Sequence, residues 1–114
     1  MAEHNISGQK AEEKAALFLQ EKGYEILERN YRYKRSEIDI IARKGNTMIF
    51  VEVKYRSGNS YGDPEASVDE KKETHILSGA ENYVFDKDWN GEVRFDIISI
   101  LRDRTIEHFE DAFG

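Results

Sequence analysis

The chain has 114 residues, which is enough for one domain with one modest hydrophobic core. It contains no cysteine, which excludes a disulfide framework, a thiolate metal site and a cysteine nucleophile. The formal net charge of −6 argues against a simple cationic nucleic-acid binder, but not against a nuclease, since metal-binding carboxylates are themselves acidic. We find no repeat or linker, so we expect 1–114 to be a single domain.

The N-terminal segment 7–22 predicts a helix because its apolar residues recur at helical spacing. Ser7 is the expected N-cap, and Gly23 is the expected stop. The residues before this helix are polar and do not read as a signal peptide. No run approaches the roughly 18 apolar residues of a membrane span, so we expect a soluble protein in the cytoplasm and no membrane partner.

The next segments have the two-residue period and the Ile, Val and Tyr content of strands. We expect these strands at 24–33, 37–43 and 47–55. The order then changes: a capping box at 67–70 predicts a second helix, and 92–101 predicts a fourth strand, against which 105–109 pairs back. This α-β-β-β-α-β-β order predicts an α/β fold with a mixed sheet flanked by helices.

The most informative stretch is the hairpin around Gly45-Asn46, which we interpret as a two-residue type II′ turn. In that register paired positions sum to 91, so Asp39 falls opposite Glu52, and Glu37 falls opposite Lys54. Because side chains alternate along a strand, all four are expected on one face. The other face would be apolar and would point to the core, with Ile38, Ile40, Ala42, Ile49, Val51 and Val53.

This arrangement predicts a candidate catalytic set of Asp39, Glu52, Lys54 and Glu37. Two directly opposed carboxylates repel each other. A divalent cation between them converts that repulsion into chelation, and Mg²⁺ often uses only one or two carboxylates with water and phosphate. A nearby lysine can hold the attacking water or offset charge on a phosphate, so the set has the parts for phosphodiester hydrolysis.

A plainer interpretation stays open for the same residues. Acidic side chains on a solvated strand face are common, and Glu37 with Lys54 is an ordinary cross-strand ion pair. A D…ExK pattern alone is short and matches by chance. The register also depends on the assumed turn, and a slip of one residue would move the whole set to the other face.

Longer motifs surround this core along the chain. They include Gly8, Ala11, Glu12 and Ala15, then Gly23-Tyr24, 29–32, 37–42, 50–56, 61–64, Lys72 and 94–96. This series resembles the YraN-like family of predicted bacterial endonucleases, which is similar to archaeal Holliday junction resolvases within the PD-(D/E)xK nuclease superfamily. The resemblance spans about residues 7 to 101.

The resemblance implies a restriction-endonuclease-like αβββαβ core and a metal-dependent nuclease. It implies that a metal ion, Mg²⁺ or Mn²⁺, is held by Asp39, Glu52 and the backbone carbonyl of Val53, with Lys54 beside it. Glu12 matches the acidic residue often found on the first helix. It is either a further metal ligand or a residue at the edge of the helix's apolar side.

Nucleic-acid contacts are expected from two further segments. Lys72 points toward the site, or else it extends along the helix edge with its ammonium in water. The stretch after the catalytic strand is aromatic and basic, so it can contact phosphates and stack bases, or it is an ordinary surface loop. Its candidate binding residues are Tyr55, Arg56, Ser57 and Tyr61.

The sequence thus supports three hypotheses. The first is an endonuclease that uses Mg²⁺ or Mn²⁺ to hydrolyse phosphodiester bonds of DNA, including branched or damaged DNA. The alternative is a catalytically weak or inactive nucleic-acid-binding module on the same fold, and a third reading is a structural adaptor. The intact Asp39, Glu52 and Lys54 favour the first. DNA versus RNA and the oligomeric state, including a homodimer, stay open.

Overall fold

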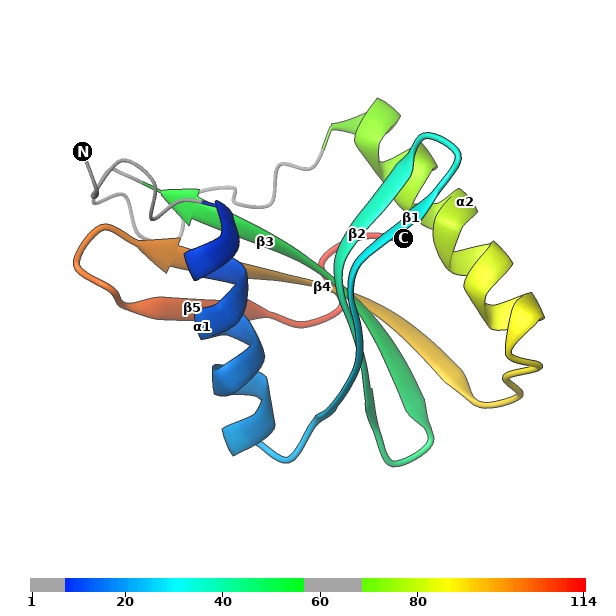
Figure 1. Ribbon diagram of the computed structural model, residues 1–114, viewed down its shortest axis with the longest axis horizontal. Coiled ribbons are helices and arrows are strands. Elements are labelled where there is room, and N and C mark those ends of the chain that lie inside the picture. Colours follow the sequence, from blue (N-terminus) through cyan, green and yellow to red (C-terminus); the bar gives the residue numbers. More distant parts are fainter. Residues whose placement is uncertain (1–7, 57–68) are drawn as a thin grey trace.

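The computed structural model describes residues 8–56 and 69–114 (Figure 1). Within these residues two helices and five strands follow one another in the predicted order. Their bounds are α1 Gly8–Glu21, β1 Glu25–Tyr33, β2 Ser36–Lys44, β3 Thr47–Arg56, α2 Glu70–Asp86, β4 Glu92–Leu101 and β5 Ile106–Phe109. Neither helix in this part of the chain is long and apolar enough to cross a membrane.

The five strands form one sheet in the order β1-β2-β3-β4-β5. All neighbours are antiparallel except β3 and β4, which run parallel over their whole length. A parallel pair needs a long crossover connection, and α2 lies within the one between β3 and β4. The predicted α/β class with a mixed sheet and flanking helices is therefore confirmed.

Each face of the sheet carries its own apolar cluster. One cluster joins α1, through Ala15 and Leu19, to the β3 residues Ile49 and Val51. The other joins α2, through Ile76 and Ala80, to residues of β3 that include Phe50. Since residues 49, 50 and 51 alternate between faces, both faces of this strand are covered. The plainer interpretation, in which the acidic face of the hairpin is solvated, is therefore wrong for Glu52, because α2 covers that face of β3.

The predicted hairpin register is confirmed where β2 and β3 pair. The pairs run from Lys44 with Thr47 to Ile40 with Val51, each summing to 91. Gly45 has a φ of +62°, while Asn46 keeps a negative φ, as a type II′ turn requires. The glycine therefore fixes the register of the hairpin.

Beyond the Ile40–Val51 pair the two strands diverge, and Figure 1 shows the start of β2 and the end of β3 separating. Side-chain alternation also breaks here. Ile38 packs in the α2 cluster while Ile40 packs in the α1 cluster, so the expectation that both belong to one apolar face is wrong. Asp39 lies between them, where the backbone ladder ends.

The start of α2 is fixed over these diverging ends by close packing. A Cβ atom at Gly79 would lie only 2.8 Å from the Cβ of Ser36, so the helix can approach β2 this closely only with glycine there. The buried Ser36 hydroxyl donates a hydrogen bond to the backbone carbonyl of His75. Together these contacts set the position of the first turns of α2 above β2.

The beginning of α2 differs from the prediction. Asp69 is the N-cap, and its carboxylate accepts the backbone N–H of Lys72 at 2.8 Å. Asp is as good an N-cap as Ser, and its charge also suits the positive end of the helix dipole. Of the predicted capping residues, Ser7 and Ser67 lie outside the described residues.

Candidate active site

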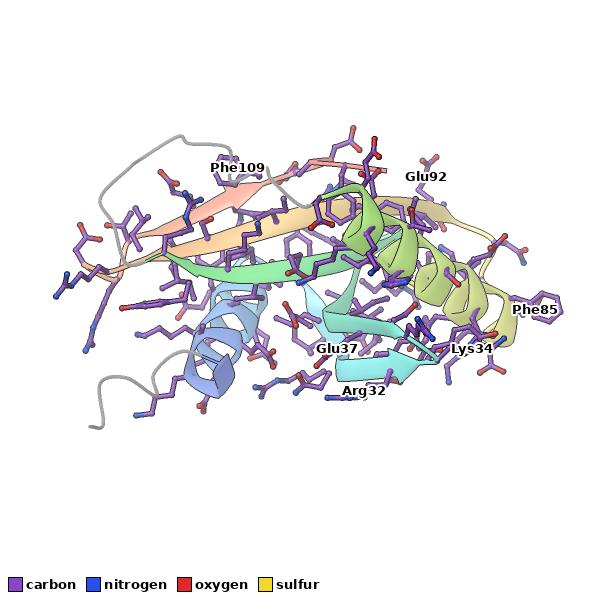
Figure 2. The ribbon with its side chains drawn as sticks, turned by 90° about the horizontal axis from the view of Figure 1, so that it is seen from above. Arg32, Lys34, Glu37, Phe85, Glu92 and Phe109 are labelled. Atoms are coloured by element: carbon purple, nitrogen blue, oxygen red, sulfur yellow. The ribbon has the colours of Figure 1, made fainter. Side chains whose placement is uncertain are left out.

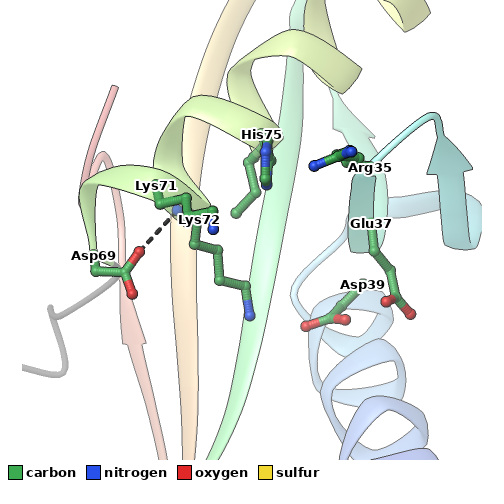
Figure 3. Close-up of a pocket in the computed structure, with 8 residues that line it drawn as sticks. Arg35, Glu37, Asp39, Asp69, Lys71, Lys72 and His75 are labelled. Atoms are coloured by element: carbon green, nitrogen blue, oxygen red, sulfur yellow. Dashed lines mark hydrogen bonds between the residues drawn. The ribbon is translucent and has the colours of Figure 1, made fainter.

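Four elements meet where β2 and β3 diverge, and each contributes one charged side chain. Glu12 comes from α1, Asp39 from β2, Glu52 from β3 and Lys72 from α2. All four line a cavity of about 280 Å³, which we call the smaller cavity. Figure 3 shows the Lys72 side chain extending from α2 toward Asp39. The fold thus gathers residues separated by up to sixty positions in the sequence.

Glu52 is the most buried acid of this group, with 4% of its surface exposed. Its Oε2 atom forms an ion pair with Lys72 Nζ at 2.5 Å, whereas its Oε1 atom is buried without a hydrogen-bond partner among the described residues. Burial and the negative charge of Asp39 raise the pKa of Glu52 from 4.5 to about 7, although Lys72 acts in the opposite direction. Neutral pH therefore falls within its titration range.

Asp39 replaces the missing backbone pairing at the end of the ladder. Its Oδ2 atom accepts the backbone N–H of Val53 at 2.8 Å, which fixes the carboxylate beside β3. Burial raises the pKa of Asp39 to about 6; the Val53 hydrogen bond lowers it, and the nearby Glu12 carboxylate raises it further. Oε1 of Glu12 is itself buried with no partner in the described part of the chain.

Unpaired buried carboxylate oxygens cost free energy, because they have lost water without gaining another donor. Glu12 and Glu52 each carry such an oxygen. The charge of Glu12 also raises the pKa of Asp39, and the charge of Asp39 raises the pKa of Glu52. A proton or a cation could satisfy these unpaired oxygens. Lys72 satisfies neither of them, because its ammonium pairs with the other oxygen of Glu52.

These carboxylates suit a hard cation that keeps part of its water shell, and they do not form a closed cage of protein ligands. Among the described residues no three Asp, Glu or His side chains converge tightly enough to hold an ion by themselves. Mg²⁺ rarely needs such a cage, since it keeps several waters and often takes one or two carboxylates. Asp39 and Glu52, with Val53 also lining the smaller cavity, are the residues that fit this requirement.

Lys72, predicted as a candidate nucleic-acid contact, pairs directly with Glu52. Lys54 is half-buried and lowers the pKa of Glu52 through its charge, but it is not among the described residues that line the two cavities. Glu37, expected opposite Lys54, accepts a hydrogen bond from Arg32 on β1 at 3.4 Å (Figure 2).

The predicted nucleic-acid contacts are only partly described. Tyr55 lines the smaller cavity with 39% of its surface exposed, and Arg56 ends β3 in a half-buried position. Ser57 and Tyr61 lie outside the described residues. Lys72 faces the carboxylates, so the interpretation that it only follows the helix edge is wrong.

A larger cavity, of about 370 Å³, adjoins the smaller one and shares Asp39 and Lys72 with it. Arg35, Lys71 and His75 line it, and sequence reasoning did not select them. The only available signal was the adjacency of Lys71 to Lys72. Arg35 lies in the turn before β2, and only the docking of α2 on that strand brings it near the other two.

A second buried acid lies at β4 and β5, outside both cavities. Asp96 is fully buried and accepts two hydrogen bonds from Arg94, both 2.9 Å, and one from the backbone N–H of Asp111 at 3.0 Å. His108 Nε2 lies 2.7 Å from it. Lys22 Nζ lies 2.8 Å from Nδ1 of that ring. An ammonium can only donate, so Nδ1 accepts and Nε2–H donates to Asp96.

These donors give Asp96 the opposite electrostatic character to Glu52. Burial alone would raise the pKa of Asp96, but hydrogen bonds from His108 and Arg94 outweigh it and hold the pKa below its usual 3.8. The carboxylate is therefore ionised and satisfied, as in a structural anchor.

Fold and site together define a mixed-sheet α/β protein with a buried acidic centre at the diverging ends of two strands. The chain belongs to the family described as "Uncharacterised protein family UPF0102", which matches residues 11–100. It is similar to a UPF0102 protein of Christiangramia forsetii, with 47% identity over 99% of this chain and 98% of the relative. Another, from Persephonella marina, is 45% identical over 95% of this chain and 93% of the relative.

Among solved structures, the chain is similar to one titled "The structure of Pyrococcus Furiosus SfsA in complex with Ca2+". The identity is 16% and the TM-score 0.31, with 90% of this chain covered. The match spans 60% of that chain's length. A likeness this weak carries no argument about function.

Proposed function

We propose that this protein is a metal-dependent endonuclease that hydrolyses phosphodiester bonds of DNA. One observation carries the proposal: the buried carboxylate of Glu52 and the half-buried carboxylate of Asp39 share a cavity with a lysine, and one Glu52 oxygen has no partner in the described structure. Such unsatisfied charge costs stability and persists where a ligand or reaction uses it. The resemblance of the motifs to predicted endonucleases points the same way.

The carboxylates would hold Mg²⁺ or Mn²⁺, with Val53 and Glu12 as the other candidate ligands. When bound, such an ion lowers the pKa of a water molecule and offsets negative charge on a phosphate. The Val53 N–H keeps Asp39 in one orientation through its 2.8 Å hydrogen bond. Glu52 is almost fully buried, which strengthens the charge interactions of its carboxylate.

The two lysines have different roles in this proposal. Lys72 neutralises Glu52 directly, and its ammonium is also attracted by Asp39. Lys54 projects from the same strand as Glu52, two residues further on, and its charge reaches the same carboxylate. Lys54 would offset the negative charge that develops on the phosphate as the bond breaks.

The test is cleavage of duplex, single-stranded, flap and four-way DNA with Mg²⁺ or Mn²⁺. We expect cleavage by wild type and its loss in Asp39→Asn, which keeps the acceptor for Val53 but removes the charge. Lys54→Ala should lower the rate on the order of 10²–10³, the usual cost of one such donor, while metal binding stays near wild type.

Asp88→Asn is the matched control, because this exposed aspartate has a φ of +55° that asparagine also tolerates. It should cleave at the wild-type rate. Equal rates in wild type and Lys54→Ala would assign the cleavage to a contaminant. No cleavage of any substrate with either metal, together with salt-sensitive DNA binding, would replace the nuclease by the binding module.

A further inference from the structure

The larger cavity separates its charges into two ends. Glu37 and Asp39 lie at one end, whereas Arg35 and His75 face each other at the other (Figure 3). Lys71 lines the cavity from the first turn of α2. The acidic end is shared with the candidate active site, so the basic end lies in the same cavity as Asp39.

The cations that line the basic end are not paired with acids of the described chain. Within residues 8–56 and 69–114, neither the Arg35 guanidinium nor the Lys71 ammonium is paired with a carboxylate. The remaining acid of the cavity, Asp69, already accepts the Lys72 N–H as the N-cap of α2, and Lys72 itself is paired with Glu52. The cations that face this end are therefore available to a ligand.

The walls of this end are fixed before any ligand arrives. Ser36, the residue after Arg35, donates its hydroxyl hydrogen bond to the His75 carbonyl, and Gly79 permits the close approach of α2. The hydrogen bond from Ser36, the neighbour of Arg35, to the backbone of His75 thus holds these two parts of the chain on either side of the cavity. A site whose frame is set in advance loses less entropy on binding.

We propose that this basic end is a phosphate subsite, in which Arg35, Lys71 and His75 hold the backbone phosphate next to the one at Asp39 and Glu52. Guanidinium binds two phosphate oxygens in a fork, lysine adds a point charge, and imidazole donates a hydrogen bond. The ligand class is a phosphodiester strand, since a second phosphate beside a reacting one occurs in a polynucleotide. The inference rests on the proposed function.

The experiment measures binding of a short single-stranded DNA by fluorescence anisotropy, at low salt, with a chelator present so that no cleavage occurs. We expect the double variant Arg35→Ala/Lys71→Ala to bind about tenfold more weakly. The slope of log K against log salt should fall by about 1, the loss of one phosphate contact. Circular dichroism checks that the variant is folded, and Arg35→Lys/Lys71→Arg should restore binding.

The matched control is Lys44→Ala/Lys87→Ala. It removes the same charge from the far ends of β2 and α2, where each lysine lies over a tyrosine ring. This control should bind DNA within about twofold of wild type. A loss equal to that of the Arg35 and Lys71 variant would mean that overall charge, and not a subsite, sets the affinity.

A second arm titrates inorganic phosphate and follows the NMR signals of Arg35 and His75. If single-stranded DNA reverses the phosphate-induced signal changes, the two ligands compete and the strand assignment is supported. If the changes persist when DNA is added, the assignment is overturned. Cleavage by wild type with binding unaffected by the double variant would reject the subsite and leave the nuclease standing. Weaker binding by the double variant, with no cleavage by wild type under any metal, would leave the subsite and reject the nuclease.

Discussion

Two carboxylates that are buried among the described residues, Asp96 and Glu52, have opposite pKa shifts. Asp96 receives a donor for each oxygen, from Arg94, His108 and a backbone N–H, and its pKa is lowered. Glu52 is almost as buried, yet one of its oxygens has no partner in the described residues, and its pKa rises to about 7. Burial is similar, so the difference in pKa comes from the donors around Asp96 and from the negative charge of Asp39 beside Glu52.

This difference separates an anchor from a site. A satisfied buried ion pair network fixes one arrangement of the chain, and removing one member leaves a buried charge alone. An unsatisfied pair of acids weakens the fold and keeps its oxygens available for a cation. The two clusters therefore predict opposite responses to mutation, pH and metal.

The largest effect is expected at the anchor. Asp96→Asn leaves Arg94 without its carboxylate and removes an acceptor from His108, so the free energy of unfolding should fall by about 3–5 kcal/mol. Urea unfolding measures it. Glu110→Gln is the control, because this acid is exposed and lies 3.7 Å from Arg94, and it should change stability by less than about 0.5 kcal/mol. Equal losses would mean that the buried network is not an anchor.

A smaller effect is expected in the pH dependence of stability without metal. The pKa of Glu52 is about 7 in the folded protein and 4.5 in the unfolded chain, so folding favours its protonated form. The stability it contributes is complete below pH 4.5 and is lost as the pH rises through 7. The glutamine of Glu52→Gln cannot ionise. In this variant the free energy of unfolding should therefore fall less as the pH rises, by on the order of 2–3 kcal/mol.

At low pH, the pH dependence of the free energy of unfolding (its acid limb) depends on the anchor residue Asp96. The pKa of Asp96 is lowered in the folded protein, so its contribution is present above pH 3.8 and is lost as the pH falls through the lowered value. Glu52→Gln should leave this limb unchanged. Urea titrations from pH 3 to 8 measure both limbs, and parallel curves for wild type and Glu52→Gln would contradict the assignment of the upper limb.

The smallest expected effect concerns metal. Lys72→Met removes the cation that partly neutralises Glu52 and Asp39, so the two acids gain more from Mg²⁺ or Mn²⁺. The metal-induced rise in Tm should exceed that of wild type by about 4 °C. Lys87→Met, a lysine stacked on Tyr83 far from the acids, should leave the rise unchanged. An equal or smaller rise in Lys72→Met would mean that Lys72 does not compete with metal.

Much of the fold was predictable because its signals are local. Period-two runs of Ile and Val predicted β2 and β3, and Gly45-Asn46 predicted the turn that fixes their register. The positive φ of Gly45 agrees with that turn. Gly23 likewise predicted the end of α1. The N-cap of α2 was predicted at Ser67, whereas Asp69 performs it, since several neighbouring residues could satisfy the same helix N–H groups.

The site was only half predictable. The hairpin register, which the sequence encodes, ends at the Ile40–Val51 pair and so carries Asp39 and Glu52 to the same cavity just beyond it. The divergence of β2 and β3 after Ile40, the break in alternation at Asp39, and the covering of the acidic face by α2 could not be predicted. These features depend on how close α2 comes to β2, which Gly79 and Ser36 decide through packing.

The sequence by itself determined the elements, the hairpin register and the pair of acids, because hydrogen bonding between neighbouring strands and turn chemistry act over a few residues. Only the tertiary structure decided that Lys72 meets Glu52, that both faces of β3 are buried, and that Arg35 faces His75 across a cavity. Those contacts join residues far apart in the chain. Their distances follow from the docking of whole helices on the sheet, which no local pattern records.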